Sequence, residues 1–326
     1  MGRRTIDSDH SAGAVYDTKF LAWESRAAVR AKPRRVLEAE WEEGKLFFPP
    51  ELTPVASHPL VAARGKTAVA DVLLQRLHVY LDFTAELEQM AVNPVTQRIS
   101  RRRLGFELPE RMIEDAYKIC TDEAWHAQFS DDLQRQLTAL TGKRPIVPET
   151  PRFFARLLET RRRAAPEVAG LAPLLFTIVS ETLISAILAG IPRNPRIVSA
   201  VRELVADHAQ DEGRHHAFFS AVFARVWPQL SPRQKRHAGP MLADFVTAFL
   251  EPDREALVSV TRAAGLSREE ALQVVEEAHP PAAVAAEIRR AAHNSLRLFA
   301  RYDVFEDPAT VEAFAARGLV GPDGAP

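Results

Sequence analysis

The sequence predicts an all-α fold built around four long helices, and three observations support this prediction. Apolar residues recur at three- and four-residue intervals over long stretches of the 326-residue chain. No stretch shows the strict alternation of apolar and polar residues that a half-buried strand requires. Asparagine, serine, proline and glycine stand at positions that are typical of helix starts and helix ends. The composition of 46% hydrophobic and 26% charged residues is ordinary for a globular protein.

The beginning of the chain predicts an irregular N-terminal arm over residues 1–60, before the first long helix. The arm shows little periodicity and is interrupted by Pro33, Pro49, Pro50, Pro54 and Pro59. A helical stripe of apolar residues follows from about Lys66. This first helix should end near Pro94, because the residue before a proline resists the α conformation.

Three more long helices follow. The second is expected over about 109–140, with Thr141-Gly142 as its stop, and the third over about 166–188. The fourth should begin after Asn194-Pro195, with the asparagine as cap, and continue to about Trp227. Other helices are expected at about 152–163, 231–250, 252–264, 267–278 and 281–301, with one short helix after Asp307.

Charge and cysteine content exclude several classes of protein. The formal net charge of −1 gives no bulk attraction to nucleic acid or to anionic lipid. The single cysteine, Cys120, cannot form an internal disulfide. The N-terminus lacks the apolar core of a signal peptide, so a cytoplasmic location is expected. Glu181 is the only charged residue within 168–191, which favours a buried bundle helix over a membrane span.

Two of the long helices carry the same short pattern of metal-binding residue types. One copy is Asp122-Glu123-Ala-Trp-His126 and the other is Asp211-Glu212-Gly-Arg-His215. A glutamate and a histidine three residues apart share one helix face and can reach one metal ion. One copy alone is a common chance match. Two copies, with a lone glutamate on each of two other helices, form the arrangement of di-iron carboxylate bundles.

The lone acids of the other two helices can be identified in part. Glu181 lies in an apolar run, where a buried carboxylate is costly unless it pairs with a cation or binds a metal. On the first helix, Glu86 and Glu88 point to different faces, and their positions alone leave the choice open. His208 shares the face of Glu212, four residues later, so it is a further ligand candidate beside the alternative of a packed histidine.

The chain resembles the p-aminobenzoate N-oxygenase family of non-haem di-iron oxygenases. The resemblance covers about 80–220 and rests on Leu-Glu-Gln-Met-Ala-Val-Asn-Pro at 87–94, Thr-Asp-Glu-Ala-Trp-His at 121–126, Ser180-Glu181 and His-Ala-Gln-Asp-Glu-Gly-Arg-His at 208–215. It implies a ferritin-like helical bundle with additional C-terminal helices. It also favours Glu88 over Glu86. The third histidine sets the family apart from most ferritin-like di-iron proteins, which use four carboxylates and two histidines.

The resemblance implies a site for two iron ions that activates O2 as co-substrate. The implied ligands are Glu88, Glu123, His126, Glu181, His208, Glu212 and His215. We expect the first three of these chiefly on one iron, the last three chiefly on the other, and Glu181 to be shared. Asp122 is expected to accept a hydrogen bond from His215, and Asp211 from His126. Tyr80, two turns before Glu88, is placed either at the substrate pocket or in the packed core.

The expected activity is oxygenation of the nitrogen of a small amine, with an aryl amine favoured. A di-iron carbon hydroxylase or desaturase is the first alternative, and a ferritin-like iron-storage or ferroxidase protein is the second. No flavin, NAD or iron–sulfur motif is found, so an external electron donor is expected. For an aryl carboxylate substrate, Arg289, Arg290, Arg297 and Arg301 are candidate partners, with surface positions as the alternative.

The domain organisation follows from these assignments. Residues 1–60 form the arm, residues 61–310 form a single di-iron helical-bundle domain, and residues 311–326 form a short C-terminal tail. Neither nucleic acid nor a membrane is expected as a partner. The oligomeric state stays open, with a homodimer among the possibilities.

Overall fold

The regular structure of the protein is helical. The computed structural model describes residues 16–37, 44–188, 190–321 and 324. Within these ranges no strand is present, and the one β-type contact is an isolated parallel bridge between Leu46 and Ile197. The prediction of an all-α fold is therefore confirmed.

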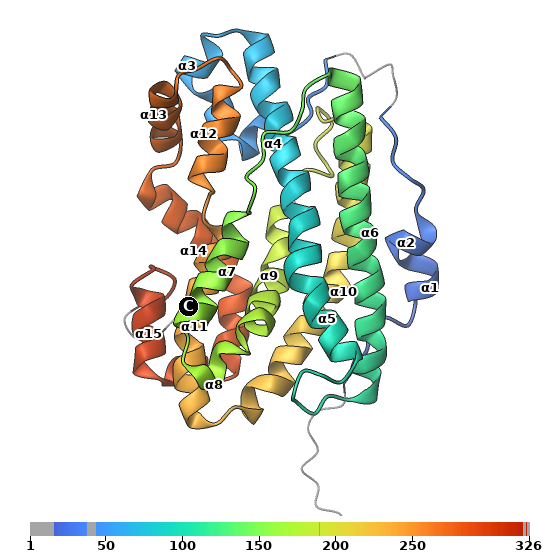
Figure 1. Ribbon diagram of the computed structural model, residues 1–326, viewed down its shortest axis with the longest axis vertical. Coiled ribbons are helices and arrows are strands. Elements are labelled where there is room, and N and C mark those ends of the chain that lie inside the picture. The colour runs from blue at the N-terminus through green and yellow to red at the C-terminus, as the bar shows by residue number, and fades with distance from the viewer. Residues whose placement is uncertain (1–15, 38–43, 189, 322–323, 325–326) are drawn as a thin grey trace, which may run out of the picture.

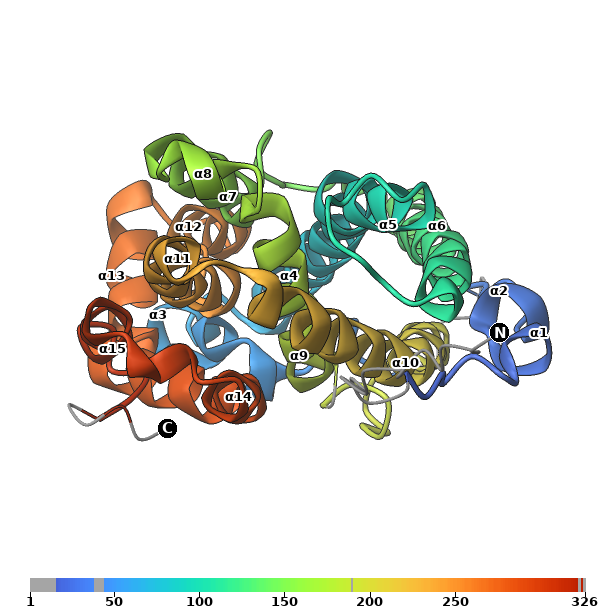
Figure 2. The same ribbon diagram turned by 90° about the horizontal axis from the view of Figure 1, so that it is seen from below.

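Four long helices form the centre of the molecule (Figures 1 and 2). They are α4 (Lys66–Leu87), α6 (Glu110–Thr141), α9 (Ala172–Leu188) and α10 (Ser199–Gln229). Helix α4 packs against α6, and α9 packs against α10, which also contacts α6. Helix α6 ends where Gly142 adopts a left-handed conformation with φ of 69°, as the sequence predicts. The buried faces of these helices meet along the bundle axis.

The first helix does not end near Pro94, so that prediction was wrong. The backbone leaves α4 in a π-helical turn, η3 (Glu88–Val92), and continues as α5 (Asn93–Ser100). Pro94 lies in the first turn of α5, where its missing N–H is tolerated. The wider hydrogen-bonding of a π turn lets the chain pass from one helix to the next without a break. Such turns occur frequently at functional sites.

The third predicted helix is divided in two. Helix α8 (Pro166–Ala169) is followed by a turn at Gly170 and then by α9. The single helix expected over 166–188 was therefore wrong at its beginning. The apolar residues of the predicted range lie in α9, whose buried side chains include Phe176, Ile178 and Val179.

The start of the fourth helix was also predicted wrongly. Helix α10 begins at Ser199 instead of directly after Asn194-Pro195. The Asn194 side chain accepts a hydrogen bond from the backbone N–H of Arg196 and so forms a turn. The next residues pair with the N-terminal arm, since Leu46 N–H donates to Arg196 O and Val198 N–H donates to Leu46 O. This long-range pairing holds the segment extended.

The C-terminal helices cover one side of the bundle. They are α11 (Pro232–Leu250), α12 (Arg254–Arg262), α13 (Arg268–Ala278), α14 (Pro281–Arg301), the short η4 (Val304–Glu306) and α15 (Pro308–Ala315), with α7 (Arg152–Arg163) beside them. Their positions agree with the predicted ranges, and the expected capping box at Ser267 and Glu270 is present. Helices α11 and α14 pack against α9, and α12 packs against α4. Helix α15 packs against α11 and crosses the expected boundary at residue 310.

The N-terminal arm crosses the bundle: its beginning lies on the side opposite the C-terminal helices, and its later part contacts α12 and α13. Its short elements are α1 (Trp23–Arg26), α2 (Ala28–Ala31), η1 (Pro50–Leu52), η2 (Pro54–Ser57) and α3 (Pro59–Ala62). Helices α1 and α2 lie outside α6 and α10 (Figure 2). Arg34 pairs with Asp132 of α6, and Arg35 pairs with Asp207 of α10. Parts of the expected arm (1–15 and 38–43) and of the expected tail (322, 323, 325 and 326) lie outside the described residues.

Among the described helices, none combines the length and the apolar character that crossing a membrane requires. The apolar α9 carries Glu181 near its middle, 1% exposed, together with the buried hydroxyl groups of Thr177, Ser180 and Thr182. Two of these hydroxyls donate to carbonyl oxygens of α9 itself, and Thr177 donates to Ala91 O of η3. These contacts place α9 in the interior of the bundle, as expected.

Candidate metal centre

The four long helices bring seven predicted metal-binding side chains to one place in the core. Glu88 is the first residue of η3, Glu123 and His126 lie on α6, Glu181 lies on α9, and His208, Glu212 and His215 lie on α10. Each of the seven is at most 1% exposed. The three- and four-residue spacings on α6 and α10 explain why these side chains share the inner faces of their helices.

The candidate ligand atoms fall into three overlapping groups, in each of which the atoms lie within 4.8 Å of one another. The groups are Glu88, His126, His208 and Glu212; Glu123, His126, Glu212 and His215; and Glu88, Glu123 and Glu181. Together they contain all seven predicted residues. They divide the side chains differently from the expected partition, because His208 is grouped with Glu88 and His126.

Glu212 is the central carboxylate of this cluster. Its Oε1 lies 3.0 Å from His208 Nε2, 3.3 Å from His215 Nδ1 and 3.5 Å from His126 Nδ1. Glu123, on α6, contacts two of the same histidines. Its Oε2 lies 2.8 Å from His126 Nδ1, and its Oε1 lies 2.9 Å from His215 Nδ1. Both glutamates can therefore bridge two neighbouring metal positions.

The choice between Glu86 and Glu88 has a clear structural answer. Glu88 is buried and shares a group with Glu123 and Glu181. Glu86 lies on the outer side of α4, where it lines a surface groove between α4 and α6 with Asp82 and Asp131. Only Glu88 is placed to contact a metal in the cluster.

The unsatisfied polar atoms of the cluster fit a metal site. Five of the eight carboxylate oxygens lack a hydrogen-bond partner: Oε2 of Glu88, Oε1 of Glu123, Oε2 of Glu181 and both oxygens of Glu212. Nδ1 of His215 and both ring nitrogens of His208 also lack one. Leaving so many polar atoms unpaired in a core is costly, whereas metal coordination satisfies them. Two divalent ions would also balance the four carboxylate charges.

The pKa directions show how strongly these groups interact. Burial raises the pKa of Glu88 and of Glu181 well above the usual range, and the neighbouring carboxylates act in the same direction. Burial opposes ionisation of Glu123 as well, yet the nearby His215 and His126 bring its pKa down to about 2. Protons and charges in the metal-free cluster are therefore shared between acids and imidazoles. Binding of a cation would displace those protons.

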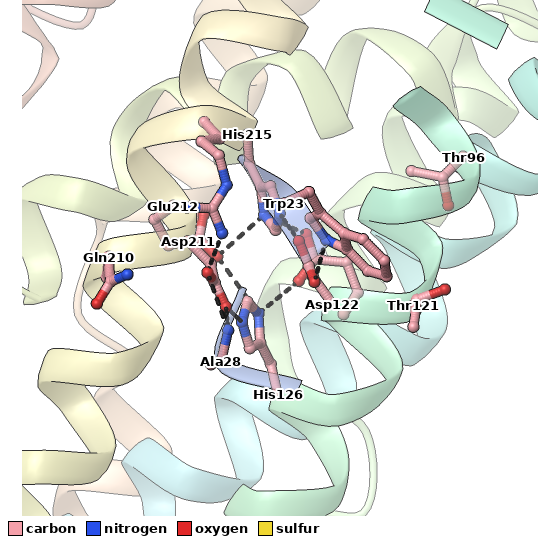
Figure 3. Close-up of polar contacts among 12 residues, drawn as sticks. Trp23, Ala28, Thr96, Thr121, Asp122, His126, Gln210, Asp211, Glu212 and His215 are labelled. Atoms are coloured by element: carbon pink, nitrogen blue, oxygen red, sulfur yellow. Dashed lines mark hydrogen bonds and ion pairs between the residues drawn. The ribbon is translucent and has the colours of Figure 1, made fainter. Parts of the chain in front are cut away.

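Two buried aspartates orient two of the histidines, in the pairs that the sequence suggests (Figure 3). His215 Nε2 lies 3.2 Å from Asp122 Oδ2, and His126 Nε2 lies 3.2 Å from Asp211 Oδ2. In both histidines, Nδ1 then faces the cluster. The pKa of His126 rises to about 10 despite its burial, because Asp211 and Glu123 both accept hydrogen bonds from its ring.

The N-terminal arm donates a hydrogen bond to each of the two aspartates. The sequence did not indicate these contacts. The indole N–H of Trp23 donates to Asp122 Oδ1 at 2.8 Å, and the backbone N–H of Ala28 donates to Asp211 Oδ2 at 3.0 Å (Figure 3). Arg214 also pairs with Asp211. Only the position of Arg214, three residues after Asp211, carried a sequence signal for such a contact. Trp23 and Ala28 lie about 100 or more residues away in sequence and share no pattern with the helices.

Tyr80 is a buried residue of α4 close to the cluster. It is 4% exposed, its hydroxyl has no hydrogen-bond partner of good geometry, and its ring packs 5.7 Å from that of Phe48. Burial raises the pKa of Tyr80, and the charge of Glu212 adds to the shift. The four arginines suggested as carboxylate partners on α14 (Arg289, Arg290, Arg297 and Arg301) are all exposed.

Comparison with known proteins gives a consistent result. The family model for p-aminobenzoate N-oxygenase AurF matches residues 21–303. The chain is 26% identical over 272 residues to a 4-aminobenzoate N-oxygenase of Streptomyces thioluteus, covering 81% of this chain and 80% of that protein. The match includes all four long helices and the seven clustered side chains. The chain therefore belongs to the p-aminobenzoate N-oxygenase AurF family and is an oxygenase enzyme.

Proposed function

We propose that this enzyme is a di-iron N-oxygenase that uses O2 to oxidise the nitrogen of a small aryl amine. The observation that carries the proposal is the buried cluster of four glutamates and three histidines, whose free oxygen and nitrogen atoms converge. Mixed carboxylate and imidazole ligands from four helices suit a pair of iron ions. Membership of a family of di-iron oxygenases supports the same metal.

The groups of neighbouring atoms suggest how the ligands would be shared. Glu88, His126 and His208 would hold one iron, and Glu181 and His215 the other. Glu123 and Glu212, whose oxygens lie between the histidines of both positions, would bridge. When bound, the metal pair supplies activation of O2 and its reduction. This proposed arrangement differs from the partition expected from the order of the motifs along the chain.

The protein's own side chains prepare the site for that chemistry. Asp122 and Asp211 accept the Nε2 protons of His215 and His126, which fixes the tautomer that presents Nδ1 to the metal. The nearly complete burial of the ligands excludes water, so charges in the site are weakly screened. Both effects preorganise the ligands before metal binds.

An aryl amine as substrate is supported by the name of the relative. The matched protein of Streptomyces thioluteus is named for oxygenation of 4-aminobenzoate.

The test uses the iron-loaded full-length protein with O2, a chemical reductant and a panel of amines that includes 4-aminobenzoate and aniline. We expect mass spectrometry to show N-oxygenated products that carry label from ¹⁸O2. Products oxygenated or desaturated at carbon would support the hydroxylase or desaturase alternative. Accumulation of iron far beyond about two per chain, without oxidation of amine, would support iron storage.

A further inference from the structure

Hydrogen bonds lead from Trp23 through Asp122 to His215, whose other ring nitrogen faces the cluster (Figure 3). The indole Nε1 donates to Asp122 Oδ1 at 2.8 Å, and Asp122 Oδ2 lies 3.2 Å from His215 Nε2. On the other side of the imidazole ring, His215 Nδ1 lies 2.9 Å from Glu123 Oε1. The path therefore passes through one carboxylate and one imidazole before it reaches the metal-binding atoms.

The outer end of this path lies at the edge of the protein. Trp23 belongs to α1, outside α6 and α10, and is 8% exposed (Figure 2). The guanidinium of Arg30 lies 5.7 Å from the indole ring centroid, and Leu21, two residues before Trp23, is 81% exposed. By contrast, Asp122 and His215 are fully buried. The indole is thus the part of the path that a molecule outside the protein can approach most closely.

The corresponding pair on the other side of the cluster ends differently. Asp211, which contacts His126, accepts a hydrogen bond from the backbone N–H of Ala28 and pairs with the guanidinium of Arg214. These donors satisfy the carboxylate as well as an indole N–H does. An amide and a guanidinium have no accessible one-electron chemistry, whereas an indole is readily oxidised and conjugated. A hydrogen bond to Asp122 alone therefore does not require a tryptophan at position 23.

We propose that Trp23, Asp122 and His215 form the route by which electrons from an external one-electron donor reach the iron centre. This proposal rests on the proposed function. Each transfer oxidises one reduced donor by one electron and converts one Fe³⁺ to Fe²⁺, so two transfers prepare the pair of irons. No bond in the protein forms or breaks, and the protons stay on Trp23 Nε1 and on the His215 ring.

The test measures reduction directly, without substrate turnover. The iron-loaded, oxidised full-length protein is mixed without O2 with a reduced plant-type ferredoxin, and the loss of ferric absorbance is followed. Trp23→Phe should slow this reduction at least about 10-fold, since it removes both the indole and its hydrogen bond to Asp122. Trp125→Phe is the matched control. Trp125 lies on α6, next in sequence to His126, and packs on Phe129. Iron in the Trp125→Phe protein should be reduced at a rate within about twofold of that in the unmodified protein.

Two further measurements separate electron transfer from a structural role. Iron content should stay at about two per chain in the Trp23→Phe protein. After full reduction with dithionite, a single exposure to O2 and amine should give the unmodified rate of product formation, because this step bypasses the route. A Trp23→Tyr variant, which keeps an aromatic ring with a hydrogen-bond donor, should recover part of the reduction rate.

Each contrary outcome is decisive. Reduction of the Trp23→Phe protein at the unmodified rate would overturn the route. A loss of iron, or an equally slow product-forming step after dithionite treatment, would show that Trp23 only positions His215, which also overturns it. A protein that binds and reduces iron but oxidises no amine would overturn the proposed function and leave the route standing. A protein that binds no iron would overturn both.

Discussion

His208 lies one helical turn before Glu212 on α10, and its Nε2 is 3.0 Å from Glu212 Oε1. The same nitrogen lies 3.8 Å from Glu88 Oε1, and the ring centroid is 4.3 Å from that of His126. Among the described residues, no aspartate contacts the His208 ring as Asp211 and Asp122 contact His126 and His215, and Nδ1 of His208 has no hydrogen-bond partner. His208 therefore faces the cluster with Nε2, whereas the other two histidines face it with Nδ1.

This geometry predicts the effect of removing the third imidazole. His208→Ala should keep the fold and bind iron with lower affinity, because six of the seven clustered side chains remain. N-oxygenation should fall by at least about 10-fold, since even changes beyond the ligands have effects of that size. Iron titration, visible absorption and product formation are the measurements. His216→Ala, at the next position of α10 and outside the metal-binding groups, is the control. Normal spectra and normal turnover in His208→Ala would remove His208 from the site.

The second prediction concerns the metal content of the protein. Glu181→Ala should lose most of its iron, because it removes a buried carboxylate that would bind one metal position and leaves an apolar methyl group on α9. Glu86→Ala removes a glutamate from the outer groove of the same bundle and should keep about two irons per chain. Elemental analysis after gel filtration compares the two. Full iron retention in Glu181→Ala would contradict its assignment as a ligand.

Much of the fold and the cluster could be predicted because it depends on short-range spacing. The pairs Glu123–His126 and Glu212–His215 share helix faces through local geometry alone, and the apolar run around Glu181 indicates burial. Most of the helix boundaries after residue 230 follow from local capping, as at Ser267. Apart from Glu86, the residues that the sequence indicated as ligand candidates are those that the fold brings together.

The remaining features depend on contacts between distant parts of the chain. The π turn at Glu88 and the late start of α10 at Ser199 cannot be read from propensity, since the first needs an i→i+5 pattern and the second needs pairing with Leu46. The contact of Trp23 with Asp122 spans 99 residues. The grouping of the clustered side chains also depends on how α6 and α10 face each other and not on the order of the motifs.

The third prediction concerns the contact between α11 and α15. A Cβ atom on Gly239 would lie 2.0 Å from Thr310 Oγ1 and 3.0 Å from Thr310 Cβ, so the two helices approach closely at this glycine. Gly239→Ala should therefore lower the free energy of unfolding by about 2 kcal/mol, as expected for overpacking of a core. Denaturant unfolding gives the value.

Two variants make that prediction specific. Gly213→Ala, at an exposed position of α10 where an added Cβ meets nothing within 4 Å, should raise the free energy of unfolding by about 0.5–1 kcal/mol. Combining Gly239→Ala with Thr310→Ala should recover part of the lost stability, because the truncation removes the two outer atoms of the clash. A Gly239→Ala protein as stable as the unmodified one would mean that α15 can move away without cost.

The last prediction concerns pH and the buried imidazole of His78 on α4. The side chain is 0% exposed, and neither ring nitrogen has a hydrogen-bond partner of good geometry among the described residues. Burial lowers the pKa of His78 from 6.5 to about 4. Between these two values the unfolded chain binds more protons at this residue than the folded protein does. Its contribution to stability is therefore fully present above about pH 6.5 and is lost as the pH falls toward 4.

His78→Leu should remove this dependence. The difference in unfolding free energy between the unmodified protein and the variant should change by about 3 kcal/mol between pH 7 and pH 4, to the disadvantage of the unmodified protein at pH 4. Comparing the two metal-free proteins cancels the titration of the cluster, which both retain. His293→Gln replaces an exposed histidine of α14 and is the control for the loss of a histidine that is not buried. Parallel pH profiles for the unmodified protein and His78→Leu would show that the buried imidazole becomes protonated in the folded protein as readily as in the unfolded chain.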